Sequence, residues 1–280
     1  MLDMINSLLK AVCNPPAISG DTLKFNLRTT KPVGAIYLEP LSTLFDICAS
    51  LAMALTIVYF LIEMNRRWVF EASDVTLKTI FVPFLKLLAA VGLITHAKQI
   101  AVATMSVFNE MVDVLEEEVY DSWDAITLSG LGLIACAFIL LPLLIVWLVS
   151  LVIQFAYWYK VMGFKLEFYY RAAVTPIAMA DIYNDFSSGS IRWIKSLFAF
   201  GLYGLAFLVL PPLCKILVAD VANVGSITTM ISDSAAELAE NVFLGIWDFI
   251  KALVCGLLAP IAALGTLSVV KQLTKEAVGG

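Results

Sequence analysis

Charged side chains are scarce in this sequence. Asp, Glu, Lys and Arg make up 15% of its 280 residues, whereas soluble domains carry about 25%. Hydrophobic residues make up 61%, which is more apolar surface than a soluble protein of this length can hide from water. We therefore predict that lipid surrounds much of the chain and that the fold class is all-α, a polytopic membrane helical bundle.

The sequence also lacks the motifs of the common enzyme classes. It holds no phosphate-binding loop, dinucleotide-binding motif, zinc-protease motif or serine-hydrolase motif. His96 is the only histidine, and one histidine does not make a zinc site. Paired carboxylates occur only in acidic connecting segments, where water leaves their chemistry ordinary. We expect no enzymatic activity, no metal and no cofactor, with bound phospholipid as the one small molecule anticipated.

The cysteines show no spacing typical of a metal site or a redox motif. They are Cys13, Cys48, Cys136, Cys214 and Cys255. Four of them lie in or beside apolar runs, where cysteine behaves as a small hydrophobic residue. A basic stripe is missing too, and the net charge is −5. Nucleic acid is therefore not expected as a direct partner.

Several apolar runs are long enough to cross a bilayer, for which a helix needs about 20 residues. They cover residues 42–62, 79–97, 128–158, 196–218 and 245–270. A sixth span over residues 166–183 is disfavoured because Glu167, Arg171 and Asp181 lie inside it, and charges at mid-membrane are costly. The sequence thus predicts about five transmembrane helices.

Basic residues gather in the connections on one side of this predicted bundle. They follow the first span, follow the third span and recur in the C-terminal tail, whereas the opposite connections hold only Lys98 and Lys215. Because cytoplasmic connections are enriched in Lys and Arg, we predict an external N-terminus and a cytoplasmic C-terminus. The N-terminal residues Lys10, Lys24, Arg28 and Lys31 run against this bias.

The connections divide the chain into regions. Residues 1–40 are expected outside the cytoplasm, as an amphipathic helix followed by an extended segment, and residues 41–280 form the bundle. The bundle has an acidic, helical outer loop (98–127), a cytoplasmic connection (159–195), which we call the elbow, and a second outer loop (219–241). The apolar face of the first helix, at Leu2, Ile5, Leu8, Leu9 and Val12, either packs on the bundle or lies flat on the outer leaflet.

The elbow is the most polar stretch between two long apolar runs. Pro176 is expected to break or kink any helix there, and residues 187–190, Ser-Ser-Gly-Ser, predict a turn or a helix cap. Arg192, Trp193 and Lys195 then suit anchoring of the next helix at the lipid headgroups.

Charges inside the predicted spans need partners or water. Lys86 lies in the middle of the second span, and either faces a lumen or reaches the headgroups along its aliphatic stem. Asp248 and Lys251 are three residues apart at the outer entrance of the fifth span, so we expect them to pair.

The order Arg171, Pro176, a polar turn and then Trp193 at the opening of another span resembles the VirB6/TrbL-type inner-membrane subunits of conjugative type IV secretion systems. Thr175 precedes the proline, where that family typically has an alanine. The motif covers residues 171–193, and the predicted five-span topology resembles the family over most of the chain.

The resemblance implies a channel or scaffold subunit in the bacterial cytoplasmic (inner) membrane, one that helps translocate DNA or protein and nucleates pilus assembly. It implies a homo-oligomer that contacts membrane lipid, other channel subunits, pilin and separate ATPases, with nucleic acid only as cargo. The residues implied in partner docking are Arg171, Pro176, Asp181, Asp185, Arg192, Trp193 and Lys195. The alternative is a small-molecule transporter or permease.

Overall fold

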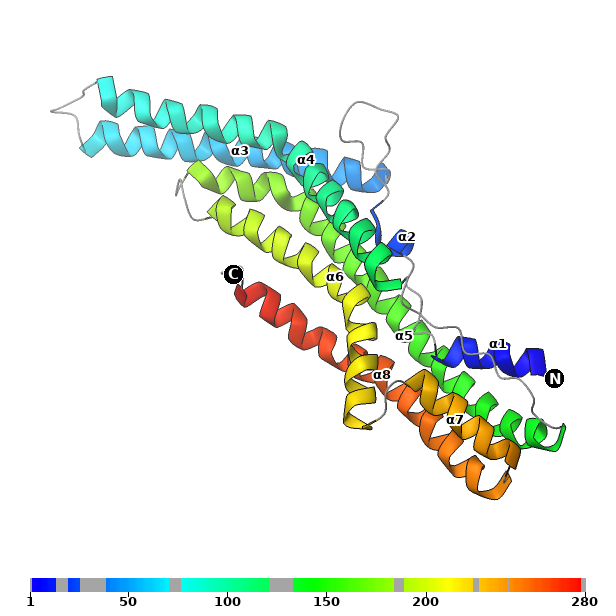
Figure 1. Cartoon of the computed structure of the whole chain (residues 1–280). Helices are drawn as coiled ribbons and strands as arrows, with labels where there is room; N and C mark the ends of the chain where they lie inside the picture. Colours follow the sequence, from blue (N-terminus) through cyan, green and yellow to red (C-terminus); the bar gives the residue numbers. More distant parts are fainter. Residues whose placement is uncertain are drawn as a thin grey trace. The chain divides into compact units, whose positions relative to one another are not determined.

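The computed structural model of the chain describes residues 2–13, 20–25, 39–70, 77–120, 133–183, 189–223, 227–240 and 242–277. All regular structure within these ranges is helical (Figure 1). The elements are α1 (Leu2–Cys13), α2 (Gly20–Leu23), α3 (Glu39–Phe70), α4 (Leu77–Tyr120), α5 (Leu133–Ala180), the short 3-10 helix η1 (Asp181–Tyr183), α6 (Gly189–Val221), α7 (Ile227–Glu240) and α8 (Val242–Ala277).

Five of the described helices are long and apolar enough to cross a membrane, which confirms the predicted number of spans. These stretches are Leu41–Val69 in α3, Ile80–Glu117 in α4, Ile139–Ala180 in α5, Gly189–Val221 in α6 and Ile246–Ala277 in α8. Every one is longer than its predicted span, because helix continues into the flanking polar residues. The chain is therefore a polytopic, all-helical membrane protein.

The chain divides into two compact units. Unit 1 comprises Met1–Leu23, Met111–Gly163 and Gly204–Gln272, and unit 2 comprises Lys24–Glu110, Phe164–Tyr203 and Leu273–Gly280. The helices α4, α5, α6 and α8 each contribute residues to both units. Each unit has a buried cluster of its own.

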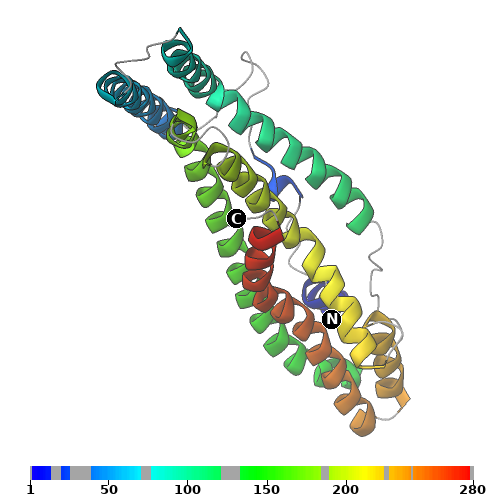
Figure 2. The same ribbon diagram turned by 90° about the vertical axis from the view of Figure 1, so that its left-hand side faces the viewer.

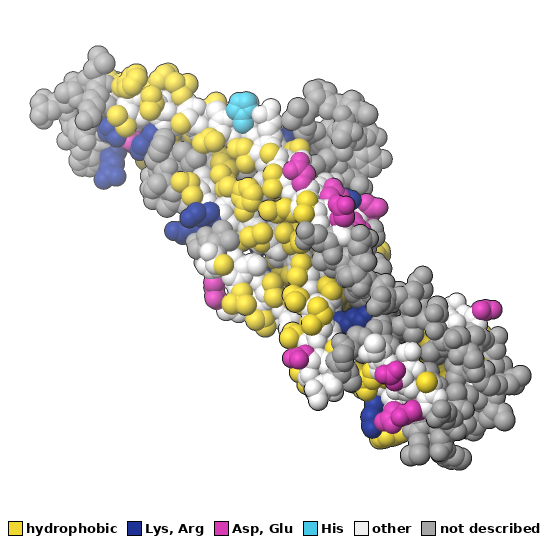
Figure 3. All heavy atoms as spheres, in the orientation of Figure 1, with side chains coloured by type: hydrophobic (Ala, Val, Ile, Leu, Met, Phe, Trp, Pro, Cys, Tyr) yellow, Lys and Arg dark blue, Asp and Glu magenta, His cyan; other side chains and the backbone are white. Residues whose placement is uncertain are grey.

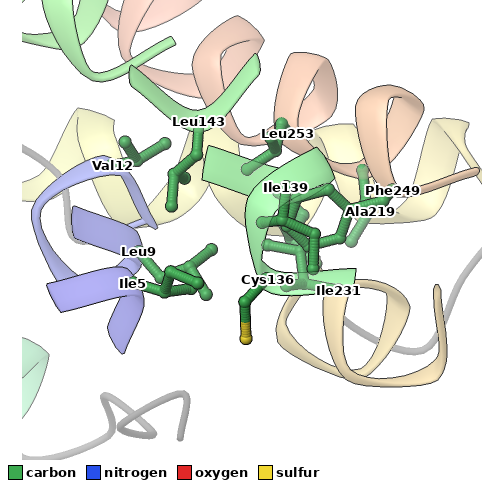
Figure 4. Packing of buried hydrophobic residues seen from close by; sticks show 12 residues of the cluster. Ile5, Leu9, Val12, Cys136, Ile139, Leu143, Ala219, Ile231, Phe249 and Leu253 are labelled. Atoms are coloured by element: carbon green, nitrogen blue, oxygen red, sulfur yellow. The ribbon is translucent and has the colours of Figure 1, made fainter. Parts of the chain in front are cut away.

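Unit 1 has an aliphatic core that includes the N-terminal helix (Figure 4). Ile5, Leu9 and Val12 of α1 are at most 2% exposed and join a cluster with residues of α5, α6, α7 and α8. Phe249 is the one aromatic ring among the buried members. Of the two arrangements open for α1, packing on the bundle is therefore the one observed.

Unit 2 contains a hairpin of α3 and the first part of α4, which lie side by side in two views (Figures 1 and 2). Its buried cluster joins Phe45 and Ala52 of α3, Ile94 and Ala97 of α4, and Met179 and Ala180 of α5. Half of these six side chains are alanine. Small side chains let helices approach closely. In lipid the hydrophobic effect does not drive helices together, so this close packing is what holds them.

Large apolar side chains lie on the outside of the long helices. Figure 3 shows hydrophobic atoms spread over α3 and α4, and the exposed residues there include Ile47, Leu51, Leu61, Phe84 and Leu88. In water such a surface would drive aggregation, whereas in a bilayer it meets acyl chains. The exposure pattern thus agrees with a lipid environment.

The elbow differs from its prediction. α5 runs on through Pro176 to Ala180, so of the expected break or kink the break is wrong, and α6 begins at Gly189. Proline removes one backbone donor, but Ala172 and Met179 on either side of it are fully buried. Packing on both sides of the proline holds the helix through that one missing hydrogen bond.

Other predicted connections also contain helix. The acidic segment 98–127 is helical to Tyr120, as predicted, and the segment 219–241 contains α7. The short α2 lies in the stretch expected to be extended. The serine-rich turn at 187–188 lies outside the described residues.

Candidate functional site

The elbow motif forms a hydrogen-bonded clasp between the end of α5 and the start of α6. The Trp193 indole Nε1 donates to Thr175 Oγ1 at 3.2 Å, and Ser190 Oγ donates to the Ala178 carbonyl at 3.0 Å. Thr175 and Ser190 are buried. We call these four residues the α5–α6 clasp.

Arg171 extends this contact by one helical turn along α5. Its guanidinium Nη2 is 2.8 Å from Glu167 Oε1 on the same helix. Its Cζ also lies 4.6 Å from the ring centroid of Phe200 on α6, within the range of a cation–π contact. Thr175 Oγ1 donates to the Arg171 carbonyl at 3.1 Å, so the arginine and the clasp are directly joined.

Asp181 and Gly189 lie close together, one on either side of the connection between α5 and α6. A Cβ placed on Gly189 would lie 2.6 Å from Asp181 Oδ2, closer than side chains approach one another. Glycine at the first residue of α6 therefore lets the carboxylate sit at the positive end of that helix. At Gly92, Gly163, Gly201, Gly256 and Gly265 an added Cβ would meet nothing so close.

The remaining predicted docking residues fall in different surroundings. Pro176 is buried, whereas Asp181, Arg192 and Lys195 are exposed. Asp185 lies outside the described residues. The structure therefore brings Arg171 and Trp193 together through Thr175 and leaves Arg192 and Lys195 facing outward on the first turns of α6.

A second polar group joins α3 and α4 near the same turn. Lys86 Nζ of α4 lies 3.7 Å from Glu63 Oε1 of α3, and Arg67 Nη2 lies 2.6 Å from the same oxygen. These three side chains are only 20–26% exposed. Lys86 thus has a carboxylate partner inside the bundle, and its lumen-facing role stays a prediction.

Tyr183 of η1 completes this group. Its ring lies 5.8 Å below Lys86 Nζ and meets Phe60 of α3 edge-on, with centroids 6.5 Å apart. The hydroxyl is buried and makes no hydrogen bond within the described residues. Burial first, and then the nearby Glu63 carboxylate, raises the pKa of Tyr183 above its ordinary value. The hydroxyl therefore stays protonated.

Two other sequence predictions can be compared with the structure. Lys251 Nζ and Asp248 Oδ1 are 2.7 Å apart, which confirms the expected pair. His96 Nδ1 lies 2.9 Å from Gln99 Oε1 on the same helix. Among the described residues, no group of His, Cys, Asp or Glu has the arrangement of a metal site.

The position of Lys165 differs from the predicted one. The sequence places it in the cytoplasmic elbow and places Lys24 outside the membrane, yet Lys165 Nζ donates to the Lys24 carbonyl at 2.8 Å. Both residues belong to unit 2. The cause is the length of α5, which carries Lys165 inside an apolar helix and not in a connection.

Sequence reasoning missed Thr175, Glu63 and Tyr183. In the sequence Thr175 is only a departure from the family pattern, although its hydroxyl can accept a hydrogen bond from the Trp193 indole. The Glu63 to Arg67 spacing of four residues was a usable signal of a helical ion pair. Nothing local marks Tyr183, since its partners come from two distant helices.

Comparisons with family models, characterised proteins and solved structures return no match. The secretion-subunit resemblance therefore rests on residues 171–193 and on the number of spans.

Proposed function

We propose that this protein is a membrane-embedded scaffold or channel subunit of a conjugative type IV secretion apparatus. In this role it helps translocate DNA or protein, forms a homo-oligomer in the bacterial inner membrane and contacts pilin, other channel subunits and the ATPases. The orientation is the one predicted from the basic connections, with the α5–α6 turn in the cytoplasm.

The α5–α6 clasp is the observation that supports this proposal. The residues that carry the family resemblance, Arg171 and Trp193, are used to lock two helices into a fixed hairpin. The exposed charged side chains at this end of the two helices are Asp181, Arg192 and Lys195. Charged side chains on two helices that are already joined are suited to docking a soluble partner, because the partner need not order these helices on binding.

The test is a transfer assay in the native host. The gene is deleted and replaced by a copy carrying Arg171→Ala and Trp193→Ala, and donor-to-recipient transfer is measured beside membrane insertion. We expect transfer to be abolished with insertion intact. Phe198→Ala is the matched control, since this aromatic residue lies on the same helix with 44% of its surface exposed.

Two outcomes would contradict the proposal. Normal transfer from the deletion strain would remove the secretion role altogether. Normal transfer from the double variant would remove the clasp from that role. Particle imaging in nanodiscs adds an independent measure, since a scaffold around a path should form a ring.

A transporter or permease is the second candidate, supported by the Glu63, Arg67 and Lys86 group. Charged side chains within spans commonly mark substrate or ion pathways. In this case Lys86→Met would abolish solute uptake and leave conjugative transfer unchanged. If the protein is a secretion subunit, the Arg171→Ala, Trp193→Ala variant should instead lose conjugative transfer and leave solute uptake unchanged.

A further inference from the structure

Positive charge is in surplus where α3 and α4 run side by side in unit 2. Arg67 and Lys86 both face the carboxylate of Glu63, and Arg66, the neighbour of Arg67 in the chain, is exposed. Figure 3 shows dark blue Lys and Arg atoms gathered near one end of this hairpin, next to hydrophobic atoms. One carboxylate cannot neutralise three cations, so this end of unit 2 carries a net positive charge.

The ammonium of Lys86 lacks a hydrogen bond within the described residues. Arg67 donates to Glu63 Oε1 from Nε at 3.1 Å and from Nη2 at 2.6 Å. Lys86 Nζ lies 3.7 Å from the same oxygen, beyond the roughly 3.2 Å limit of an N–H···O hydrogen bond. Its other contact is the face of the Tyr183 ring. An ammonium has three N–H donors, and here they still need an acceptor.

Lys251 of α8 shows how a lysine in another apolar helix is satisfied. Its Nζ lies 2.7 Å from Asp248 Oδ1, and its side chain is 52% exposed. Lys86 is only 24% exposed and has no such bond. Both lysines lie in stretches apolar enough to cross a membrane, where a charge needs a partner. Lys86 is therefore the one of the two that calls for a partner from outside the chain.

The surroundings of Lys86 are those of a membrane interface. Trp68, just after the two arginines, is exposed, and tryptophan is enriched at the level of the lipid headgroups. Phe84 and Leu88 flank Lys86 in the sequence of α4, and both are exposed as well. An acceptor that approaches from this side comes from lipid, and the lipid group that offers charged oxygens is the headgroup phosphate.

We propose that Lys86, with Arg66 and Arg67 beside it, binds the headgroup phosphate of an anionic phospholipid at the α3–α4 hairpin. Basic sites between transmembrane helices bind anionic headgroups in this way. The ammonium donates to a phosphate oxygen, and the acyl chains cover the apolar surface of α4. Glu63 keeps its hydrogen bonds with Arg67, so no contact of the chain has to break.

This proposal assigns Lys86 to the headgroups and not to a lumen, and it rests on neither candidate function. The experiment titrates the full-length protein in detergent with phosphatidylglycerol or phosphatidylcholine and counts bound lipids by native mass spectrometry. Lys86→Met should weaken phosphatidylglycerol binding about fivefold, the effect of one basic residue near an anionic headgroup. It should leave phosphatidylcholine binding unchanged, and Lys86→Arg should retain the phosphatidylglycerol affinity of the wild type.

Lys251→Met is the matched control, because this lysine already has its carboxylate partner. It should leave phosphatidylglycerol binding unchanged. Equal weakening by Lys86→Met and Lys251→Met, or no weakening by Lys86→Met, would overturn the proposal. Excess glycerol 3-phosphate should not displace the lipid, since it has no acyl chains. Displacement by it would make a soluble phosphate the ligand and would overturn the assignment to lipid.

A second measurement does not depend on the folding of any variant. Wild-type protein is placed in nanodiscs that contain phosphatidylglycerol with a photoreactive diazirine on its headgroup, and the crosslinks are mapped by mass spectrometry. Crosslinks within residues 62–69 or 82–88 support the site. Crosslinks confined to other segments overturn it.

Discussion

The two units of this protein solve the same packing problem with different chemistry. Unit 1 has an aliphatic cluster in which Phe249 is the one buried ring, and apart from that cluster a single buried pair of rings among its described residues, Tyr157 and Phe207, that meet edge-on. Unit 2 joins its helices through side-chain hydrogen bonds, an ion-paired group and a large set of aromatic contacts. Both kinds of contact therefore occur within one apolar chain.

The difference shows what each kind of contact can specify. Between helices in lipid, apolar side chains gain only close packing, because acyl chains are equally apolar. Hydrogen bonds and ion pairs are directional, so they fix which residue faces which. We infer that unit 1 tolerates exchange between apolar residues of similar volume, whereas a substitution at a polar contact of unit 2 removes one specific partner.

The largest expected effect tests the packing of unit 1. Phe249→Ala should lower the free energy of unfolding by about 3–5 kcal/mol, because a fully buried ring is replaced by a cavity. Reversible unfolding in mixed micelles measures it. Phe249→Leu is the control and should lose much less, and equal losses for both would mean that unit 1 is not tolerant of apolar exchange.

The next effect tests the ion-paired group of unit 2. Glu63→Gln should cost about 1–3 kcal/mol, less than for a fully buried pair because these side chains are 20–26% exposed. The same unfolding measurement on Glu63→Gln with Lys86→Met should recover part of the loss, since an unpaired cation is removed. A double variant no more stable than Glu63→Gln alone would show that Lys86 does not depend on Glu63.

A smaller effect is expected for the clasp. Trp193→Phe and Thr175→Val each remove one partner of the 3.2 Å hydrogen bond. Their double-mutant cycle should give a coupling of about 0.6 kcal/mol, the typical size for hydrogen bonds between membrane helices. A coupling of zero would mean that the two residues contribute by packing alone, and unit 2 would then resemble unit 1.

The smallest effect is expected at Tyr183. Tyr183→Phe should change stability by less than about 0.5 kcal/mol near neutral pH, because the buried hydroxyl makes no hydrogen bond within the described residues. A larger loss would reveal a bond to Glu63.

The raised pKa of Tyr183 predicts that the stability of the protein depends on pH. The pKa of Tyr183 is raised in the folded protein from an ordinary value of 10.0, so the unfolded chain ionises first as pH rises. Wild-type stability should therefore fall relative to Tyr183→Phe above about pH 10. A constant difference between pH 8 and 11 would contradict this assignment.

Sequence reasoning succeeded where a signal is periodic or compositional. The spans, the α1 helix and the Asp248–Lys251 pair all follow from hydropathy or from helical spacing. It failed where helix continues past a breaker, as at Pro176, since tertiary packing outweighs one lost hydrogen bond. It also could not find the hydrogen bond that the Phe25 backbone N–H donates to Asn109 Oδ1, because the partners are 84 residues apart and neither carries a local pattern.

The length of α5 has a consequence for the membrane boundary. Its 48 residues rise about 72 Å, more than twice the roughly 30 Å of hydrocarbon in a bilayer. To immerse all of it, the helix would have to lean by about 65°, beyond the roughly 40° limit of known spanning helices. A straight α5 would therefore extend beyond the hydrocarbon of the bilayer, and labelling of single engineered cysteines along the helix with a water-soluble thiol reagent would show which residues reach water.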